Sequence, residues 1–249
     1  MPGVAGLNSF ATGPLLAGPL LGECGPHSVR VWAQARDEQT LSLTVFLSDG
    51  RAQSYTAQPT ADEHYCVVFD VEGLSPGSRH EYALSSAHGT TERYSLRAGC
   101  EPTARRIRLA FGSCYKDYKT AVQPIFASIK SESPDVFMIL GDTCYFDEDD
   151  ARNEAAMMQA HLRNRNNDSI RPLVAAVPTL AIWDDHDFGP NDSDGTFARK
   201  TSSLRAFKRM WAQQQYGLAG VPGIFSNVRL GPVEIFLLDV RYNRRSRRH

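Results

Sequence analysis

A period of two in the apolar residues runs from Ser28 to Arg97 and most constrains how this part of the chain can fold. In "SVRVWAQA", Val29, Val31 and Ala33 occupy alternate positions. "LSLTVFLSDG" and "YCVVFDV" repeat the alternation, and the first of them ends in an Asp-Gly pair that favours a hairpin turn. Several short strands at regular spacing predict an all-β sandwich.

The pattern changes near residue 100, where strand-like and helix-like segments begin to alternate. We expect strands in "IRLAFGSC", "DVFMILGD" and "TLAIWDD", helices over residues 120–131, 151–164 and 199–215, and a final strand pair around Gly231 and Pro232. Such a succession predicts a layered α/β domain in which helices cover a sheet. A chain of 249 residues exceeds the usual single-domain size, so we expect two domains, over residues 1–100 and 101–249.

The last strand-like segment, "VEIFLLDV" at residues 233–240, is apolar on both of its faces. This is typical of a central strand that is covered on both sides. If nothing followed residue 249 to cover it, apolar surface and a strand edge would be exposed, and we would expect self-association through that edge.

Composition and cysteine usage exclude several classes of protein. The formal net charge is −1 and lacks the basic excess of a general nucleic-acid binder, so no such binding is expected. Five cysteines without a CxxC pair argue against a disulfide framework and a zinc ribbon. The first residues fit neither a signal peptide nor a membrane span, which predicts a cytoplasmic protein, or an exported one if a leader was omitted.

Acidic residues are concentrated in "LAIWDDHDFGPND", directly after an apolar strand-like run. Four carboxylates and one imidazole lie within nine residues: Asp184, Asp185, His186, Asp187 and Asp192. Two like charges at about 4 Å repel by roughly 1 to 4 kcal/mol, depending on the local dielectric. The segment therefore requires a nearby positive charge, and a bound cation would supply it.

The two preceding strands also end in residues that can bind metal. The first ends at Cys114, and the second ends at Asp142 with Tyr145 three residues later. In open α/β sheets, ligands gather beyond the carboxyl ends of the strands. Together with Asp185, these side chains predict a metal site along one edge of the sheet.

Several of these segments resemble known families. "GLSPGSRHEYAL" resembles the E–F corner of fibronectin type III domains, with His80 where that family usually has a tyrosine. "FGSC", "ILGDTCYFD", "IWDDHDFGPNDSDGTFARK" and "FLLDVRYNR" resemble the alkaline phosphatase D (PhoD-like) family of calcineurin-type metallophosphoesterases. The resemblance covers nearly the whole chain and implies a fibronectin-like sandwich followed by a layered α/β metallophosphoesterase domain.

The resemblance also implies roles for individual residues. Asp142 would bridge two metals, Cys114 and Tyr145 would bind Fe³⁺, and Asp185 would bind a second ion, Ca²⁺. Zn²⁺ or Mn²⁺ could stand in their place. His186 would stabilise the phosphoryl oxygens or protonate the leaving group. Two further residues would orient the ligands, namely Asp187 and Asn191.

The implied reaction is hydrolysis of a small phosphoester, a monoester or a diester, by a metal-bound hydroxide. The family closes its site with a later Gly-Asp-x-His segment, which this sequence lacks, so the metallophosphoesterase domain is expected to be incomplete and its activity low. Three hypotheses stay open: a phosphomonoesterase, a phosphodiesterase or nuclease on the same fold, and a non-catalytic metal-binding or interaction module. Three loops would set specificity: 115–120, 146–152 and 189–197.

Overall fold

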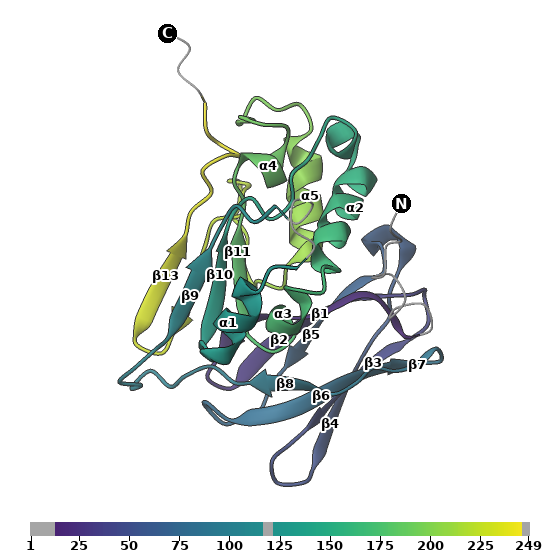
Figure 1. Ribbon diagram of the computed structural model, residues 1–249, viewed down its shortest axis with the longest axis vertical. Helices are drawn as coiled ribbons and strands as arrows, with labels where there is room; N and C mark the ends of the chain where they lie inside the picture. The colour runs from purple at the N-terminus through teal and green to yellow at the C-terminus, as the bar shows by residue number, and fades with distance from the viewer. Residues whose placement is uncertain (1–12, 117–121, 246–249) are drawn as a thin grey trace.

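The computed structural model describes residues 13–116 and 122–245, which form a β-rich part and a part that combines a parallel sheet with helices (Figure 1). The β-rich part contains two antiparallel sheets. The first has the strand order β1 (Leu15–Gly25), β2 (Ser28–Ala35) and β5 (Cys66–Val71). The second has the order β4 (Ala52–Ala57), β3 (Leu41–Phe46), β6 (Arg79–Ser86) and β7 (Gly89–Thr90), with β8 (Tyr94–Arg97) also paired to β6.

The inner faces of these two sheets share one apolar core, as the period of two predicts. Leu41, Leu43 and Val45 of β3 are fully buried and pack in the same cluster as Val29 and Val31 of β2. The alternation therefore separates the core face of each strand from its outer face. The two sheets form the predicted sandwich, whereas the closer likeness to fibronectin type III domains stays a prediction.

Strand β1 is a strand that the sequence pattern did not reveal. It contains Gly18 and Pro19, residues that normally count against a strand interior. Its pairing with β2 has register shifts between Ala17 and Leu20 and between Leu21 and Cys24. These irregularities accommodate Pro19 and break the alternation that would have identified the strand.

The second part is built on a parallel sheet in the order β11 (Thr179–Ile182), β10 (Val136–Leu140) and β9 (Leu109–Gly112). One face of it packs on helices, and Phe137, Ile139 and Ala181 belong to that core. The other elements of this part are α1 (Ile125–Ser131), α2 (Glu154–Arg165), α3 (Arg171–Val174), α4 (Asp185–Phe188), α5 (Lys200–Met210), the 3-10 turn Asp150–Arg152, and the hairpin β12 (Ser226–Leu230) and β13 (Val233–Leu237). A second 3-10 turn, Ala61–Glu63, lies between β4 and β5 of the β-rich part.

The three predicted helices are present with different bounds. Residues 120 and 121 of the first lie outside the described residues, and α1 begins at Ile125. The third helix ends at Met210 rather than residue 215, because Trp211 is extended. The backbone after Met210 bonds to strand β1 instead: Ala212 O accepts from Glu23 N at 3.0 Å.

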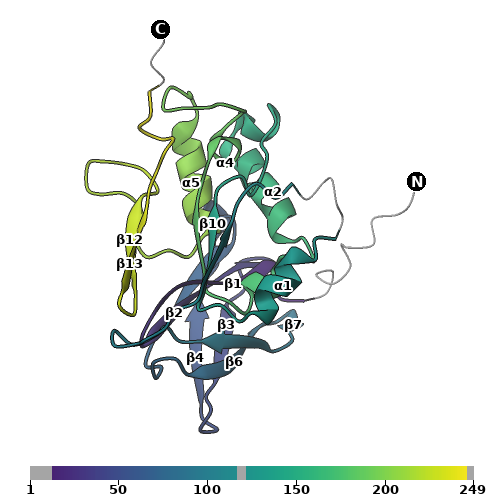
Figure 2. The same ribbon diagram turned by 60° about the vertical axis from the view of Figure 1, so that its left-hand side comes forward.

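The opposite face of the parallel sheet is not covered by helices in the part of the chain described here. Its residues Val136 and Leu180 share a core with Val228 and Leu237 of the β12–β13 hairpin. Figure 2 shows the hairpin on one side of β10 and helix α2 on the other. Because only one face carries helices, the fully layered α/β arrangement stays a prediction.

The expectation of a central strand at residues 233–240 is wrong for the described structure. Strand β13 ends at Leu237 and pairs with β12 in a two-stranded sheet. Leu237 is buried, but the side chains of Phe236 and Leu238 are 68% and 64% exposed. One face of the hairpin packs on the core, and no described residue covers the other face.

The sandwich and the helical part are in direct contact. Trp32 of β2 is fully buried in the core that the helices share, and its indole Nε1 donates to Arg209 O at 2.6 Å. Tyr82 of β6 donates its hydroxyl to Ala175 O at 2.7 Å. The domain boundary near residue 100 stays a prediction. Within the described residues, no helix combines the length and the apolar character needed to cross a membrane.

Candidate metal centre

The predicted site residues follow β9, β10 and β11 at one edge of the parallel sheet, in the loops after these strands and in or just beyond α4. Gly141 lets two of these loops approach each other, because a Cβ atom at this position would lie 2.6 Å from Asp184 N. Its φ of +99° is also a conformation that side-chain-bearing residues rarely adopt. Asp142 follows with a φ of +55°, and Cys114 has a φ of +59°. Such strain is concentrated at functional sites.

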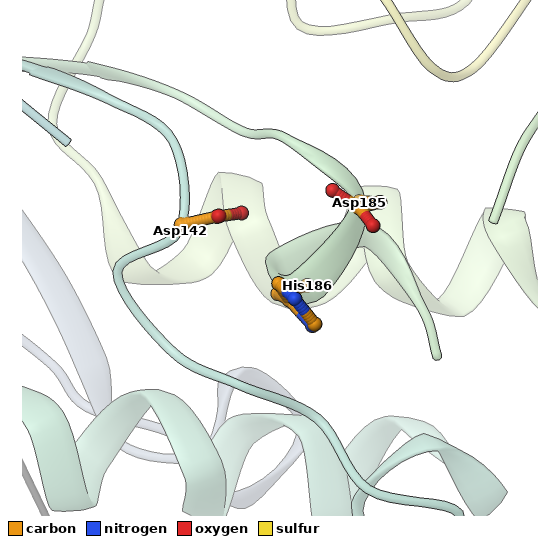
Figure 3. Close-up of side chains that lie close together, drawn as sticks. All are labelled: Asp142, Asp185 and His186. Atoms are coloured by element: carbon orange, nitrogen blue, oxygen red, sulfur yellow. The ribbon is translucent and has the colours of Figure 1, made fainter. Parts of the chain in front are cut away.

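Asp142, Asp185 and His186 form the centre of the site. One ligand atom from each lies within 4.8 Å of the others. Figure 3 shows the Asp142 carboxylate, at the end of β10, directed toward Asp185 and His186 of α4. These three groups could therefore bind one ion.

The Asp142 side chain supplies the test of whether a cation fits. The residue is 8% exposed, and its Oδ1 atom is buried without a hydrogen-bond partner among the described residues. Its Oδ2 atom lies 3.4 Å from the Cys114 thiol sulfur. A buried carboxylate oxygen without a partner is costly, and a cation at this position would satisfy it. The residues present fit a metal.

Cys114 and Tyr145 adjoin this centre. The Tyr145 ring lies 4.4 Å from the His186 ring between centroids. Burial and then Asp142 raise the pKa of the Tyr145 phenol. The Ser113 hydroxyl lowers the pKa of the Cys114 thiol, but burial and Asp142 together outweigh it and leave that pKa raised. Both groups are therefore neutral near pH 7 without a metal, and metal binding would displace their protons.

Asp187 joins the two loops rather than facing the centre. Its side chain accepts from Thr143 N at 2.6 Å and from Asp184 N at 3.0 Å. The residue is 1% exposed, and burial raises the pKa of its carboxyl well above the usual range. Asn191, by contrast, is exposed, and its side-chain amide donates to Asp192 Oδ2 at 2.7 Å. Within the described residues, no hydrogen bond connects the Asn191 side chain with Asp142 or His186.

Arg241 supplies a positive charge that the sequence analysis sought from a cation. Its Nε donates to Asp184 Oδ1 at 2.6 Å, and its Nη2 lies 3.3 Å from Asp185 Oδ1. Burial raises the pKa of Asp185, but the hydrogen bond from Asp192 N and the charge of Arg241 outweigh it and leave that pKa lowered. Part of the carboxylate repulsion is therefore relieved within the chain. The arginine in "LLDVR" was the only sequence signal for this partner.

Two further contacts were missed because their residues are distant in sequence. Lys116 Nζ lies 4.0 Å from the Tyr145 ring centre, which places a cation beside the site. Asn164 of α2 accepts from the Tyr115 hydroxyl at 2.8 Å and donates to Thr143 O. This second bond fixes the loop that carries Asp142 and Tyr145. Residues 117–120 of the predicted specificity loop lie outside the described residues.

Comparisons with known proteins indicate what this arrangement is similar to. A family model with the description "Domain of unknown function (DUF7800)" matches residues 12–91. A comparison with curated proteins finds no match. The solved structure of PhoD superimposes with a TM-score of 0.81 at 17% identity, covering 95% of this chain and 54% of that one.

A second structure, purple acid phosphatase PPD1 isolated from yellow lupin (Lupinus luteus) seeds, has a TM-score of 0.64 at 12% identity and covers 93% of this chain and 47% of that one. The chain thus spans about half the length of both proteins. At such identities the likeness concerns the fold. The chain shares its fold with PhoD and with purple acid phosphatase PPD1.

Proposed function

We propose that the chain carries the metal centre of a phosphoester hydrolase. The observation that supports this most directly is the buried Oδ1 atom of Asp142, which has no hydrogen-bond partner among the described residues. A ligand atom of this residue lies within 4.8 Å of ligand atoms of Asp185 and His186. The fold shared with PhoD and purple acid phosphatase supports the same conclusion. The substrate class is a small phosphoester.

Each side chain has a distinct task in this proposal. Asp142 would hold two cations with its two oxygens, and Asp185 would hold one of them. Cations held by these residues would activate water and neutralise charge on the phosphoryl group. His186 lies beside Asp142 and would donate a proton to the leaving oxygen. Lys116, 4.0 Å from the Tyr145 ring centre, would attract the phosphate.

The donor set favours two different metals. A thiol and a phenol, Cys114 and Tyr145, would bind Fe³⁺ as thiolate and phenolate, since a trivalent ion displaces their protons. Asp185 offers oxygen donors, which suit Ca²⁺. Zn²⁺ or Mn²⁺ are the alternatives for either position.

One observation favours a non-catalytic role. Arg241 already pairs with Asp184 and Asp185, so a positive charge stands where the second cation would bind. If this pairing persists in solution, the site holds one ion and serves as a metal-binding or interaction module. The proposal therefore requires Arg241 to release Asp185, or to share it with the ion.

Metal loading and turnover test the proposal together. The chelator-treated protein is reloaded with Fe³⁺ and Ca²⁺, bound metal is measured by mass spectrometry, and hydrolysis of an aryl phosphate monoester and diester is followed. Asp142→Asn should lower bound metal below stoichiometric and reduce turnover by about 1,000-fold, because bridging is lost. Asp168→Asn, whose side chain is 60% exposed and which lies outside the three loops and the metal centre, is the control and should change neither quantity.

The outcomes separate the hypotheses. Bound metal without turnover supports the non-catalytic module. Turnover on the diester alone identifies a phosphodiesterase. Undiminished metal content and turnover in Asp142→Asn would overturn the assignment.

Light absorption tests the identity of the first metal. Fe³⁺ bound to thiolate and phenolate should colour the protein through charge transfer, and both Cys114→Ser and Tyr145→Phe should shift or weaken that band. Circular dichroism checks that each variant is folded. An active but colourless protein that contains only Zn²⁺ or Mn²⁺ would refute the assignment of iron, but not the role of Asp142 as a metal ligand.

A further inference from the structure

A polar cavity lies on the sandwich, away from the metal centre. It has a volume of about 600 Å³ and is lined by residues of the β3–β4 hairpin, of β6, of β8 and of the segment before β8, and by Ala176. This volume falls in the range of small-molecule sites, roughly 300 to 1,000 Å³. Four arginines line it, with Glu81 as the one carboxylate among the described lining residues: Arg51, Arg79, Arg93 and Arg97.

The placement of two of these arginines is unfavourable without an anion. Arg79 of β6 and Arg97 of β8 are direct cross-strand partners, so their side chains leave the same face of the sheet. Like charges at such positions destabilise a sheet. Arg97 is neutralised by Asp135 at 2.6 Å, whereas Arg79 makes no side-chain ion pair or hydrogen bond with any residue that the structure describes. Arg79 is the available cation of this cavity.

The other two arginines are held by exchangeable contacts. Arg51 pairs with Asp49 at 2.7 Å and Arg93 with Glu81 at 3.0 Å, and all four side chains are about half exposed or more. Ion pairs this exposed contribute little, so a ligand can compete for both guanidinium groups. Arg93 also stacks on the Phe46 ring at 3.8 Å, which fixes its position at the cavity wall.

The wall also contains a buried polar atom without a partner. His80 is 9% exposed, and its Nε2 lies 2.7 Å from the Ser78 hydroxyl, but its Nδ1 has no hydrogen-bond partner among the described residues. Buried polar groups are nearly always paired. Nδ1 is shielded from solvent, and His80 alternates with Arg79 along β6, so this atom belongs to the interior of the sandwich rather than to the face that carries Arg79.

We propose that this cavity binds a diphosphate group, carried by a small organic molecule or free. A diphosphate offers two phosphoryl groups, one for Arg79 and one for Arg51 with Arg93, and guanidinium groups bind phosphate oxygens in bidentate pairs. Phe46 and Leu47 add apolar wall beside the arginines, which favours a ligand with an organic group.

The cavity and the metal centre are separate sites. Asp135, the partner of Arg97, precedes β10, and Asp142 follows it. The five residues of β10 span about 16 Å, and Ala176 and Asp185 likewise lie before and after β11. A ligand here would not touch the metal-binding groups, so the proposal does not depend on the proposed hydrolase function.

Calorimetric titration of the chelator-treated protein tests the proposal, with pyrophosphate and adenosine diphosphate as probes at fixed ionic strength. One molecule should bind per chain. Arg79→Gln should weaken binding at least 10-fold. Arg79→Lys should weaken it less, because lysine keeps the positive charge but lacks the guanidinium group that forms two parallel hydrogen bonds. Arg229→Gln, an exposed strand arginine on β12, is the matched control and should bind like the parent chain.

Further variants and probes distinguish this cavity from the metal centre and identify the ligand. Asp142→Asn should leave binding unchanged, which separates this cavity from the metal centre. Tighter binding of adenosine diphosphate than of pyrophosphate identifies an organic diphosphate, and the reverse identifies the free ion. If Arg79→Gln does not fold, as judged by circular dichroism, Arg51→Gln replaces it with the same expectation. Absence of binding, or equal binding in the parent and both arginine variants, overturns the proposal.

Discussion

The carboxyl-end edge of the parallel sheet and the interior of the sandwich are built on opposite principles. In the sandwich, Leu41, Leu43 and Val45 are fully buried aliphatic residues in ordinary strand backbone. At the sheet edge, Cys114, Asp142 and Asp192 have positive φ angles, and Asp142 holds a buried oxygen without a described partner. The first region gains stability from burial, and the second gives up some of it to hold charged groups in place.

This difference predicts that substitutions in the two regions act on different measurements. Changes in the sandwich should lower the free energy of unfolding and leave metal binding by the folded molecules intact. Changes at the sheet edge should alter metal binding most. Residues that connect the regions should test whether they unfold together.

The largest effect on stability is expected at Trp32. This side chain is fully buried, and its ring contacts the Arg165 guanidinium at 4.9 Å. Trp32→Ala should lower the free energy of unfolding by about 3 to 5 kcal/mol, because a large cavity opens in the shared core. Urea unfolding followed by fluorescence measures it, with Trp32→Phe as a milder control. A loss under about 1 kcal/mol would contradict the account of this core.

Two glycines, one in each region, allow the sheet edge and the sandwich to be compared directly. Gly141 and Gly50 both have positive φ, +99° and +87°, but a Cβ atom at Gly141 would meet Asp184 N at 2.6 Å and one at Gly50 would meet nothing within 4 Å. Both Ala variants carry the cost of a left-handed residue, about 1 to 2 kcal/mol. Gly141→Ala must also push two loops apart.

We therefore expect Gly141→Ala to lose about 3 kcal/mol of stability and to weaken metal binding at least 10-fold, whereas Gly50→Ala loses about 1 kcal/mol and binds metal normally. Urea unfolding and metal titration of both variants measure this. Equal metal affinity in the two would show that the approach of the loops does not matter to the site.

Features of the fold and of the site could be predicted where the residues that reveal them lie within one segment of the sequence. The strand β3 was predictable because its buried apolar residues occupy alternate positions of one short segment. The candidate metal ligands were predictable because they directly follow apolar segments that are recognisable as strands. Arg241 was not, since it lies 57 residues from its partner Asp184 and no pattern links them. The placement of Asn191 depended on loop conformation, and its side chain turned to Asp192.

Acid sensitivity should arise beneath the site, at His161 of α2. This residue is 4% exposed, its Nδ1 lies 3.3 Å from the Cys144 sulfur, and burial, followed by Arg165, lowers its pKa to about 3. Below its unfolded pKa of about 6.5, the unfolded chain gains a proton that the folded one does not. The stability that depends on this group is therefore complete above about pH 6.5 and is lost as the pH falls toward about 3.

The histidine should contribute up to about 1.4 kcal/mol of lost stability per pH unit in that window. Unfolding free energies of the parent and of His161→Leu, measured between about pH 4 and pH 7, isolate this contribution from that of the carboxylates. The two curves should diverge with falling pH, the parent losing more. Parallel curves would mean that His161 is protonated in the fold.

The smallest effect is expected where the two regions meet. Tyr82 of the sandwich is fully buried and donates its hydroxyl to Ala175 O at 2.7 Å, beyond α3. Tyr82→Phe keeps the ring and removes one hydrogen bond, so the loss should be about 1 to 1.5 kcal/mol. If the regions unfold as one unit, circular dichroism and fluorescence transitions in urea should stay coincident and shift together. Two separated transitions in the variant would show that this bond, rather than the shared core around Trp32, couples the sandwich to the sheet that carries the metal centre.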